Sequence, residues 1–165
     1  MRKTGFLLLL AVVCLGCAQP GSRVEHDPAA DLSRYRRVGV APFVDRRGQG
    51  PRITEGLQAG LRGLLHGGAD QEVVAAILRE HKPDREFGLS VEALELLRVK
   101  ASADAILIGS LSSDGKAASL TLVDLETGEA VLRAALRPPG RKQKAFAGPE
   151  EVVAESLRVL AVLAR

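Results

Sequence analysis

The centre of the chain reads Ala103-Asp104-Ala105-Ile106-Leu107-Ile108-Gly109-Ser110, a nearly continuous apolar run that is typical of a buried strand. A second run of this kind lies earlier, at Arg37-Val38-Gly39-Val40-Ala41-Pro42-Phe43. It also predicts a buried strand, and its ladder should end at Pro42 because proline has no N–H to donate. Both stretches indicate a fold that is built around a sheet.

Helical periodicity fills the sequence between these two strands. Helices are expected at 51–65, 71–81 and 90–98. Asp70 and Ser90 have side chains that can accept hydrogen bonds from the first free N–H groups of a helix, so they are the expected N-caps of the second and third helices.

The first of these helices contains Gly56, Gly60 and Gly63, which weaken it but are expected to let it approach the sheet closely. The inner face of the third helix is assigned to Val91, Leu94, Leu97 and Arg98.

The carboxyl-terminal half predicts a hairpin and a closing helix. Strands are expected at 117–125 and 130–136, joined by a turn in which Gly128 can take positive φ. A basic loop follows at 137–148, and then a helix at 151–165. The order β-α-α-α-β-β-β-α predicts an α/β fold with a small mixed sheet of about four strands, packed by helices.

The first residues have the organisation of a secretory signal. Arg2 and Lys3 supply positive charge, and residues 6–15 form an apolar run that is too short to cross about 30 Å of hydrocarbon as a helix. The run closes with Gly16-Cys17, and a small residue directly before a cysteine resembles the lipobox of bacterial lipoproteins. That resemblance implies a diacylglyceryl group on the Cys17 thiol and cleavage before it. An ordinary signal peptide with a coincidental cysteine is the alternative.

The expected organisation is therefore a lipoprotein signal peptide at 1–16, the lipidated Cys17 with a flexible tether at 17–30, and one α/β domain at 31–165. Ala18 after the cysteine resembles lipoproteins that are sent to the outer membrane, which implies a place on its inner leaflet facing the periplasm. Cys14 and Cys17 are the two cysteines of the chain, so the mature domain has no thiol for a disulfide or a nucleophile.

Composition excludes several classes of function. The 165 residues include 23 basic and 20 acidic side chains, and removal of Arg2 and Lys3 leaves a net charge of +1. Such a chain has no long-range field to gather nucleic acid. Aromatic residues are 3% of the chain, which disfavours base-stacking and sugar-binding surfaces.

No motif predicts catalysis, a metal or a cofactor. Residues 109–117 resemble a phosphate-binding loop, but five residues separate the glycines and Ala117 replaces the Ser or Thr that binds Mg²⁺. A turn between strands is the better interpretation. His26, His66 and His81 stand apart from one another and lack metal-ligand spacing. The chain is therefore expected not to be an enzyme.

Two basic clusters are candidate contacts for a partner or an anion. They contain Arg46, Arg47 and Arg52 near the first strand and Arg141, Lys142 and Lys144 in the late loop. Arg46 and Arg47 follow the carboxyl end of a strand, where open α/β sheets bind ligands. The alternative is solvated charge on loops and edges. A lipid headgroup, a wall polymer or an acidic protein face would fit the functional interpretation.

Four segments, in order, resemble one family of exported bacterial domains: 35–43, 53–57, 103–110 and 122–129. The family includes the periplasmic domain of CsgG, the lipoprotein LpoB and the amino-terminal domain of TolB. The resemblance runs from about residue 33 to 136. It implies a non-enzymatic envelope protein that binds other proteins.

The sequence departs from this family in three ways. The family places a strand between its first two helices, which here is either missing or shortened to Glu72-Val73-Val74. The chain also lacks the long alternating hairpins of the CsgG type. Its tether reaches at most about 50 Å, shorter than the LpoB type, so the domain should stay close to its membrane.

Three hypotheses follow. The first is a membrane-anchored adaptor that binds an envelope protein and supports an assembly or cell-wall complex. The second is a regulatory module that binds a small anion. The third is a ring-forming secretion component without the barrel hairpins, which would be a homo-oligomer.

Overall fold

The computed structural model describes residues 22–26, 32–65, 68–83, 88–140 and 143–163. The expected signal peptide, Cys17 and the beginning of the tether lie outside these residues. No helix in the described ranges is long and apolar enough to cross a membrane.

A five-stranded mixed sheet forms the middle of the molecule, with the spatial order β1-β5-β4-β3-β2. β2 and β3 are parallel, and the other three pairs are antiparallel. The strands are β1 (Arg23–His26), β2 (Val38–Val40), β3 (Ala105–Leu111), β4 (Ala118–Asp124) and β5 (Ala130–Leu136).

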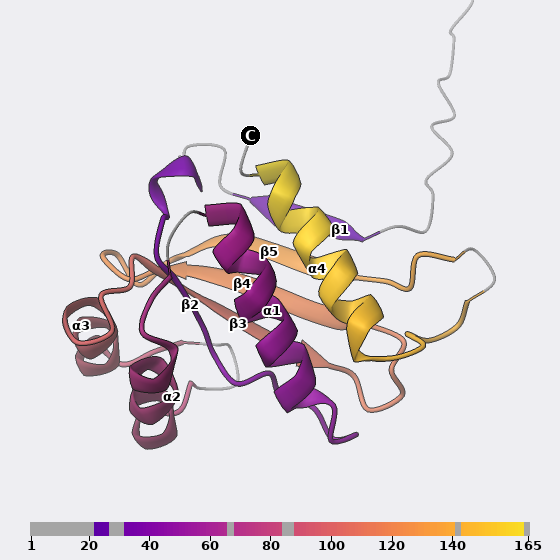
Figure 1. Cartoon of the computed structure of the whole chain (residues 1–165), viewed down its shortest axis with the longest axis horizontal. Helices are drawn as coiled ribbons and strands as arrows, with labels where there is room; N and C mark the ends of the chain where they lie inside the picture. Colours follow the sequence, from indigo (N-terminus) through magenta and orange to yellow (C-terminus); the bar gives the residue numbers. More distant parts are fainter. Residues whose placement is uncertain (1–21, 27–31, 66–67, 84–87, 141–142, 164–165) are drawn as a thin grey trace, which may run out of the picture.

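Helices pack on both faces of this sheet (Figure 1). They are α1 (Gly50–Leu65), α2 (Gln71–Glu80), α3 (Val91–Val99) and α4 (Pro149–Leu163), and a short 3-10 turn, η1 (Leu32–Arg34), precedes β2. α1 and α4 lie side by side over one face, and α2 and α3 pack on the other face near β2 and β3.

Alternation along β3 divides the core into two clusters. Leu107 points toward α1 and α4 and packs with Ile53 and Leu57. Ile106 and Ile108 point the other way, into the cluster under α2 and α3. β3 is buried on both sides for this reason, as its apolar run predicts.

The α/β class and the mixed sheet are confirmed, but the sheet has five strands rather than about four. The additional strand is β1, which lies within the range expected to be a tether and pairs with β5. The other predicted strands and helices are present, with Asp70 and Ser90 as N-caps. Gly128 has a φ of 75° in the hairpin turn, as predicted.

Three further features of the structure differ from what the sequence predicts. Glu72, Val73 and Val74 lie in α2, so they do not form a shortened strand. Val91 was assigned to an inner face but is 80% exposed, because Ala93 and Leu97 supply the buried side of α3.

The glycines of α1 also lie against a different element from the one predicted. A Cβ on Gly56 would lie 2.8 Å from Val153, and a Cβ on Gly60 would clash with the Cδ atoms of Leu157. These glycines therefore allow close packing of α1 against α4 rather than against the sheet. Gly63 has nothing within 4 Å of such a Cβ.

Candidate functional site

Among the described residues, no helix covers half of one sheet face, because α2 and α3 pack only near β2 and β3. There β4 and β5 alternate, so that Leu120 and Ala134 point into the core under α4 while Ser119, Thr121 and Arg133 point outward. We call the outward surface of β4, β5 and β1 the open face; its side chains are Ser119, Thr121, Arg133, Ala135, Arg23 and Glu25.

The open face is a shallow groove of about 680 Å³. Strand register brings its residues together: Thr121 lies opposite Arg133, which lies opposite Glu25, and Ser119 lies opposite Ala135 in the next row. The Ser110 and Ser119 hydroxyls are 2.8 Å apart. Thr121 is buried and Ser119 half-buried, whereas Arg133 and Ala135 are exposed.

An apolar groove of about 410 Å³ lies beside the open face, between α2 and the ends of β2 and β3. Its wall includes Ile108, which lies opposite Thr121, so the two grooves adjoin. Val44 in this wall is 60% exposed, and Arg79 and Lys82 also line the groove. The apolar groove and the open face together form a surface of mixed polarity, which is the composition of many non-obligate interfaces.

The predicted basic residues lie at one end of the molecule, as far as they are described. Arg46, Arg47 and Lys144 are exposed. Arg52 forms an ion pair with Glu150, with 2.6 Å between Nη2 and Oε1. Arg141 and Lys142 lie outside the described residues.

The Gly115 turn is the point at which three loops meet at this end. A Cβ on Gly115 would clash with the Arg47 guanidinium and would lie 3.8 Å from the Cβ of Ala145. The Phe146 N–H donates to the Gly115 carbonyl over 2.9 Å. The loop that was compared with a phosphate-binding loop is thus a turn between β3 and β4, with Gly115 at a φ of 70°. Contact of this end with an anion stays a prediction.

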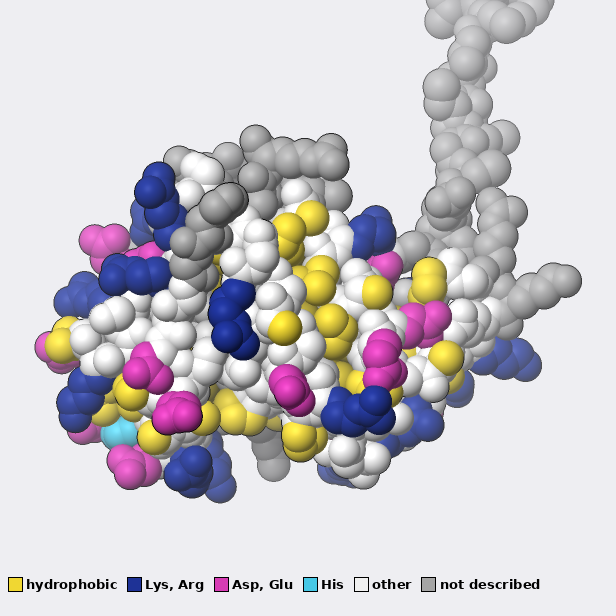
Figure 2. Space-filling model, viewed as in Figure 1, with side chains coloured by type: hydrophobic (Ala, Val, Ile, Leu, Met, Phe, Trp, Pro, Cys, Tyr) yellow, Lys and Arg dark blue, Asp and Glu magenta, His cyan; other side chains and the backbone are white. Residues whose placement is uncertain are grey.

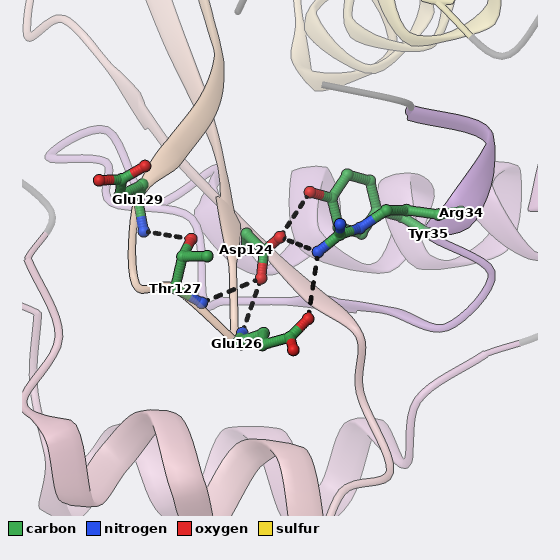
Figure 3. A network of polar contacts seen from close by, with 6 residues as sticks. All are labelled: Arg34, Tyr35, Asp124, Glu126, Thr127 and Glu129. Carbon is green, nitrogen blue, oxygen red and sulfur yellow. Dashed lines mark hydrogen bonds and ion pairs between the residues drawn. The ribbon is translucent and has the colours of Figure 1, made fainter. Parts of the chain in front are cut away.

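A polar network that the sequence analysis did not identify lies at the opposite end of the sheet (Figure 3). The Tyr35 hydroxyl donates to Asp124 Oδ2 over 2.7 Å, and Arg34 forms an ion pair with the same carboxylate. Asp124 Oδ1 accepts from the N–H groups of Glu126 and Thr127 at 2.7 and 3.2 Å. Only one feature of the sequence pointed to this network, the aspartate at the start of the Gly128 turn. Tyr35 is too far away in sequence for a local pattern to indicate its contact with Asp124.

The network fixes the protonation states of its members. Burial, together with the hydrogen bond to Asp124 and its charge, raises the pKa of Tyr35 to about 12. Burial alone would raise the pKa of Asp124, but the hydrogen bonds from Tyr35 and the turn and the charge of Arg34 outweigh it and lower this pKa. A neutral phenol bonded to an ionised carboxylate ties the β4–β5 turn to the segment before β2, which is a structural role.

No group of three His, Cys, Asp or Glu side chains in the described ranges could hold a metal ion. His81 follows α2 as its C-cap residue. His66 lies outside the described residues, and His26 is described only as part of β1. The outward surface of α1 and α4 mixes both signs of charge with exposed hydrophobic atoms along its centre (Figure 2).

Comparison with known proteins gives structural likeness alone. No family model and no curated protein matches the sequence. A PelC dodecamer from Paraburkholderia phytofirmans is 18% identical with a TM-score of 0.49, over 87% of this chain and 97% of that one. The LpoB C-terminal domain from Escherichia coli is 16% identical with a TM-score of 0.46, over 65% and 87%.

A DUF4136 family protein from Bacteroides thetaiotaomicron is 8% identical with a TM-score of 0.45, over 87% of this chain and 92% of that one. With identities this low and TM-scores below 0.5, the likeness carries no inference about activity, partner or assembly.

Proposed function

We propose that the chain is a lipid-anchored, non-enzymatic adaptor of a bacterial envelope complex, and that it binds a partner protein through the open face. One observation carries this proposal: in the described part of the chain, half of a sheet face has no helix on it, and the exposed Arg133 and Ala135 line a shallow groove there, beside an apolar groove. Two adjoining grooves of this kind are accessible to another protein without rearrangement of the described elements.

The amino-terminal sequence supports the location. Gly16-Cys17 after an apolar run resembles a lipobox, and several acyl chains exceed the two signals that stable anchoring needs. The adaptor would then face the periplasm from the inner leaflet of the outer membrane. The resemblance of four sequence segments to CsgG, LpoB and TolB domains supports a role in an envelope assembly or cell-wall complex.

The anchor is tested by metabolic labelling with an alkyne fatty acid. Cys17→Ser should abolish labelling, because the thiol and the acylated amino terminus both belong to that residue. Cys14→Ser is the matched control, since it removes the other cysteine and should leave labelling intact. Labelling of the Cys17→Ser variant would contradict the anchor.

The open face is tested by photo-crosslinking in living cells. A photoreactive amino acid at Ala135, which is exposed on the open face, should give one dominant product with another envelope protein. The same amino acid at Ala59, which is exposed on α1, is the control and should give none. Equal products from both positions, or no product from Ala135, would contradict the proposal.

A second candidate function is anion binding at the Gly115 turn, because the structure brings Arg47 and the loop of Lys144 together there. Inorganic phosphate should then raise the melting temperature in a saturable way, since a ligand that binds the native state stabilises it. Arg47→Ala should reduce this shift without unfolding the protein, because the Arg47 guanidinium lies at the Gly115 turn and the residue is exposed. A melting temperature that does not respond to phosphate would argue against it.

A further inference from the structure

The two edge strands of the sheet, β2 and β1, differ in how their outer backbone groups are covered. At the β2 edge, the Gln71 side chain occupies the place of a neighbouring strand: its Oε1 accepts from the Val40 N–H at 3.0 Å, and its Nε2 donates to the Val38 carbonyl at 3.2 Å. Beyond the strand, the Phe43 N–H donates to Thr54 Oγ1 over 2.8 Å. Side chains from α2 and α1 thus block this edge against pairing with another chain.

The β1 edge has no such protection from the described part of the chain. β1 forms its ladder with β5, and no other described residue bonds to the backbone of Arg23–His26. In an antiparallel strand the N–H and C=O groups of alternate residues point to opposite sides, so two of the four residues direct theirs away from β5. The side chains of Arg23, Val24 and Glu25 are exposed.

Contacts within the chain already fix the position of β1. The hydroxyl of Ser22, directly before β1, accepts from the Arg137 N–H at 3.1 Å and donates to Glu155 Oε1 at 2.5 Å. Glu155 is buried on α4 and forms an ion pair with Arg158, 2.6 Å from Nη2 to Oε1. Because β1 is tied to both α4 and the end of β5, pairing along its outer edge would cost little additional ordering.

We propose that β1 pairs antiparallel with β1 of a second copy, about a two-fold axis perpendicular to the sheet, so that two five-stranded sheets join into one. This inference does not rest on the adaptor function. Such an axis keeps the same face upward in both copies, so residues that lie opposite each other must share a face. Four registers centred on a residue of β1 satisfy this condition, with Arg23, Val24, Glu25 or His26 opposite itself. The His26 register brings no other residue of β1 opposite the second β1, so it forms almost no ladder.

Charge selects one register. With Arg23 or Glu25 opposite itself, like charges face each other, which destabilises a strand pair. With Val24 opposite Val24 of the second copy, each Arg23 lies opposite the second copy's Glu25. Arg23 and Glu25 already form an ion pair within one chain, 2.7 Å from Nη2 to Oε1, which shows that both lie on the same side of β1. In the dimer these charges exchange partners, and Val24, now 36% exposed, becomes covered.

Cysteine crosslinking of the full chain in native membranes tests this register. Residues directly opposite in an antiparallel pair have Cβ atoms about 4.5–5.5 Å apart, close to the span of a disulfide. Val24→Cys should therefore give an oxidised homodimer. Arg23→Cys and Glu25→Cys should each remain monomeric alone and give a mixed dimer when co-expressed, while the chain without these substitutions controls for Cys14 and Cys17.

Each alternative outcome overturns the proposal. A homodimer from Glu25→Cys alone would indicate another register. A Val24→Cys crosslink to a different protein would indicate that a heterologous strand occupies the edge, and no crosslink would indicate that nothing pairs there.

Light scattering of the detergent-extracted full chain gives an independent measurement. Arg23→Glu places like charges opposite each other in every copy and should convert the dimer into a monomer. The variant should still unfold cooperatively, because Arg23 is exposed and faces Ala135 on β5, and its melting temperature should fall only by the stabilisation that dimerisation supplies. Lys144→Glu makes the same change of charge on an exposed residue of a distant loop and should leave the dimer intact. A monomeric unsubstituted chain, or a dimeric Arg23→Glu variant, would overturn the proposal.

Discussion

Asp124 joins segments that are far apart in the sequence. The residue is 3% exposed. Its carboxylate accepts hydrogen bonds from the Tyr35 hydroxyl and from two N–H groups of its own turn. Arg34 adds an ion pair, and its guanidinium lies 5.1 Å from the centre of the Tyr35 ring. One buried side chain therefore holds the β4–β5 turn against the start of the domain.

Asp124→Asn should lower the free energy of unfolding by about 1–3 kcal/mol, because it leaves buried donors without their ionised acceptor. The chain has one tyrosine, so its titration by ultraviolet absorbance reports on Tyr35 alone. The midpoint should lie near 12 in the native protein and should fall in the variant, because burial, the largest cause of the raised pKa, remains while the hydrogen bond and charge of Asp124 are lost. An unchanged midpoint would show that burial alone sets it.

Local residue roles could be predicted from the sequence, and distant ones could not. Asp70 and Ser90 were identified as N-caps because each bonds to N–H groups two or three positions away. The partnership of Tyr35 with Asp124 spans 89 positions, and nothing in either neighbourhood indicates it.

At the scale of elements, the contact between α1 and α4 depends on glycine. Gly60→Ala should lower the free energy of unfolding by about 1–2 kcal/mol, because its Cβ would clash with Leu157 in a packed interface. Gly63→Ala is the matched control in the same helix and should raise the free energy of unfolding by about 0.5–1 kcal/mol, because its Cβ meets open space. Urea unfolding measures both, and equal stabilisation would contradict the tight contact.

The Gln71 side chain, which covers the edge of β2, can be tested by substitution. Gln71→Glu keeps an acceptor for the Val40 N–H but loses the donor to the Val38 carbonyl and places a charge beside it. We expect a loss of about 1–3 kcal/mol in the free energy of unfolding. Gln71→Ala should lose less stability but should aggregate more, because it uncovers the strand edge. Urea unfolding and light scattering distinguish the two effects.

β1 was missed because its sequence does not look like a strand. Residues 18–28 are rich in Pro, Gly, Ser and charge, which favoured a tether. β1 has four residues, and Arg23, Val24 and Glu25 are all exposed, so no apolar alternation marks it. Its stability comes from the ladder with β5 and from the bonds of Ser22, which local pattern does not encode.

At the scale of the whole molecule, several carboxyl groups link stability to pH. The pKa values of Asp45, Asp104 and Asp124 are lowered by hydrogen bonds and nearby arginines, which outweigh burial. Hydrogen bonds from Ser112 and Lys116 lower the pKa of Asp114 to about 2. A carboxyl group whose folded pKa is lowered stabilises the native state above its ordinary pKa, and that stability is lost as the pH falls through the folded pKa.

The free energy of unfolding should therefore fall between about pH 4 and pH 2. Tyr35 acts at the other end, where its contribution is complete below pH 10 and is lost as the pH rises through about 12. Urea unfolding across this range measures both limits, and Asp124→Asn should flatten part of the acid limb. A stability that stays constant down to pH 2 would contradict these shifts.

The sequence predicted the class of fold and the order of most elements, because the buried strands and capped helices are local patterns. It could not predict the order of strands in the sheet, since Arg23 pairs with Ala135 across most of the chain. The open face was equally hidden, because Ser119 and Arg133 become neighbours only through register. The basic residues could be identified from the sequence. Their approach to one another at the Gly115 turn could not, because it depends on contacts between distant loops.

The position of β1 has a mechanical consequence. If lipid at Cys17 holds the chain, a load between membrane and domain reaches Ser22 and β1 before any buried element. Separating β1 from β5 breaks a short ladder and leaves both core clusters packed, since neither contains a β1 side chain. β1 should therefore detach first, and each released residue should add about 3.3 Å to the length of chain between the membrane and the domain. Optical-trap pulling on both termini should record this small extension before the main rupture, and a single rupture would contradict it.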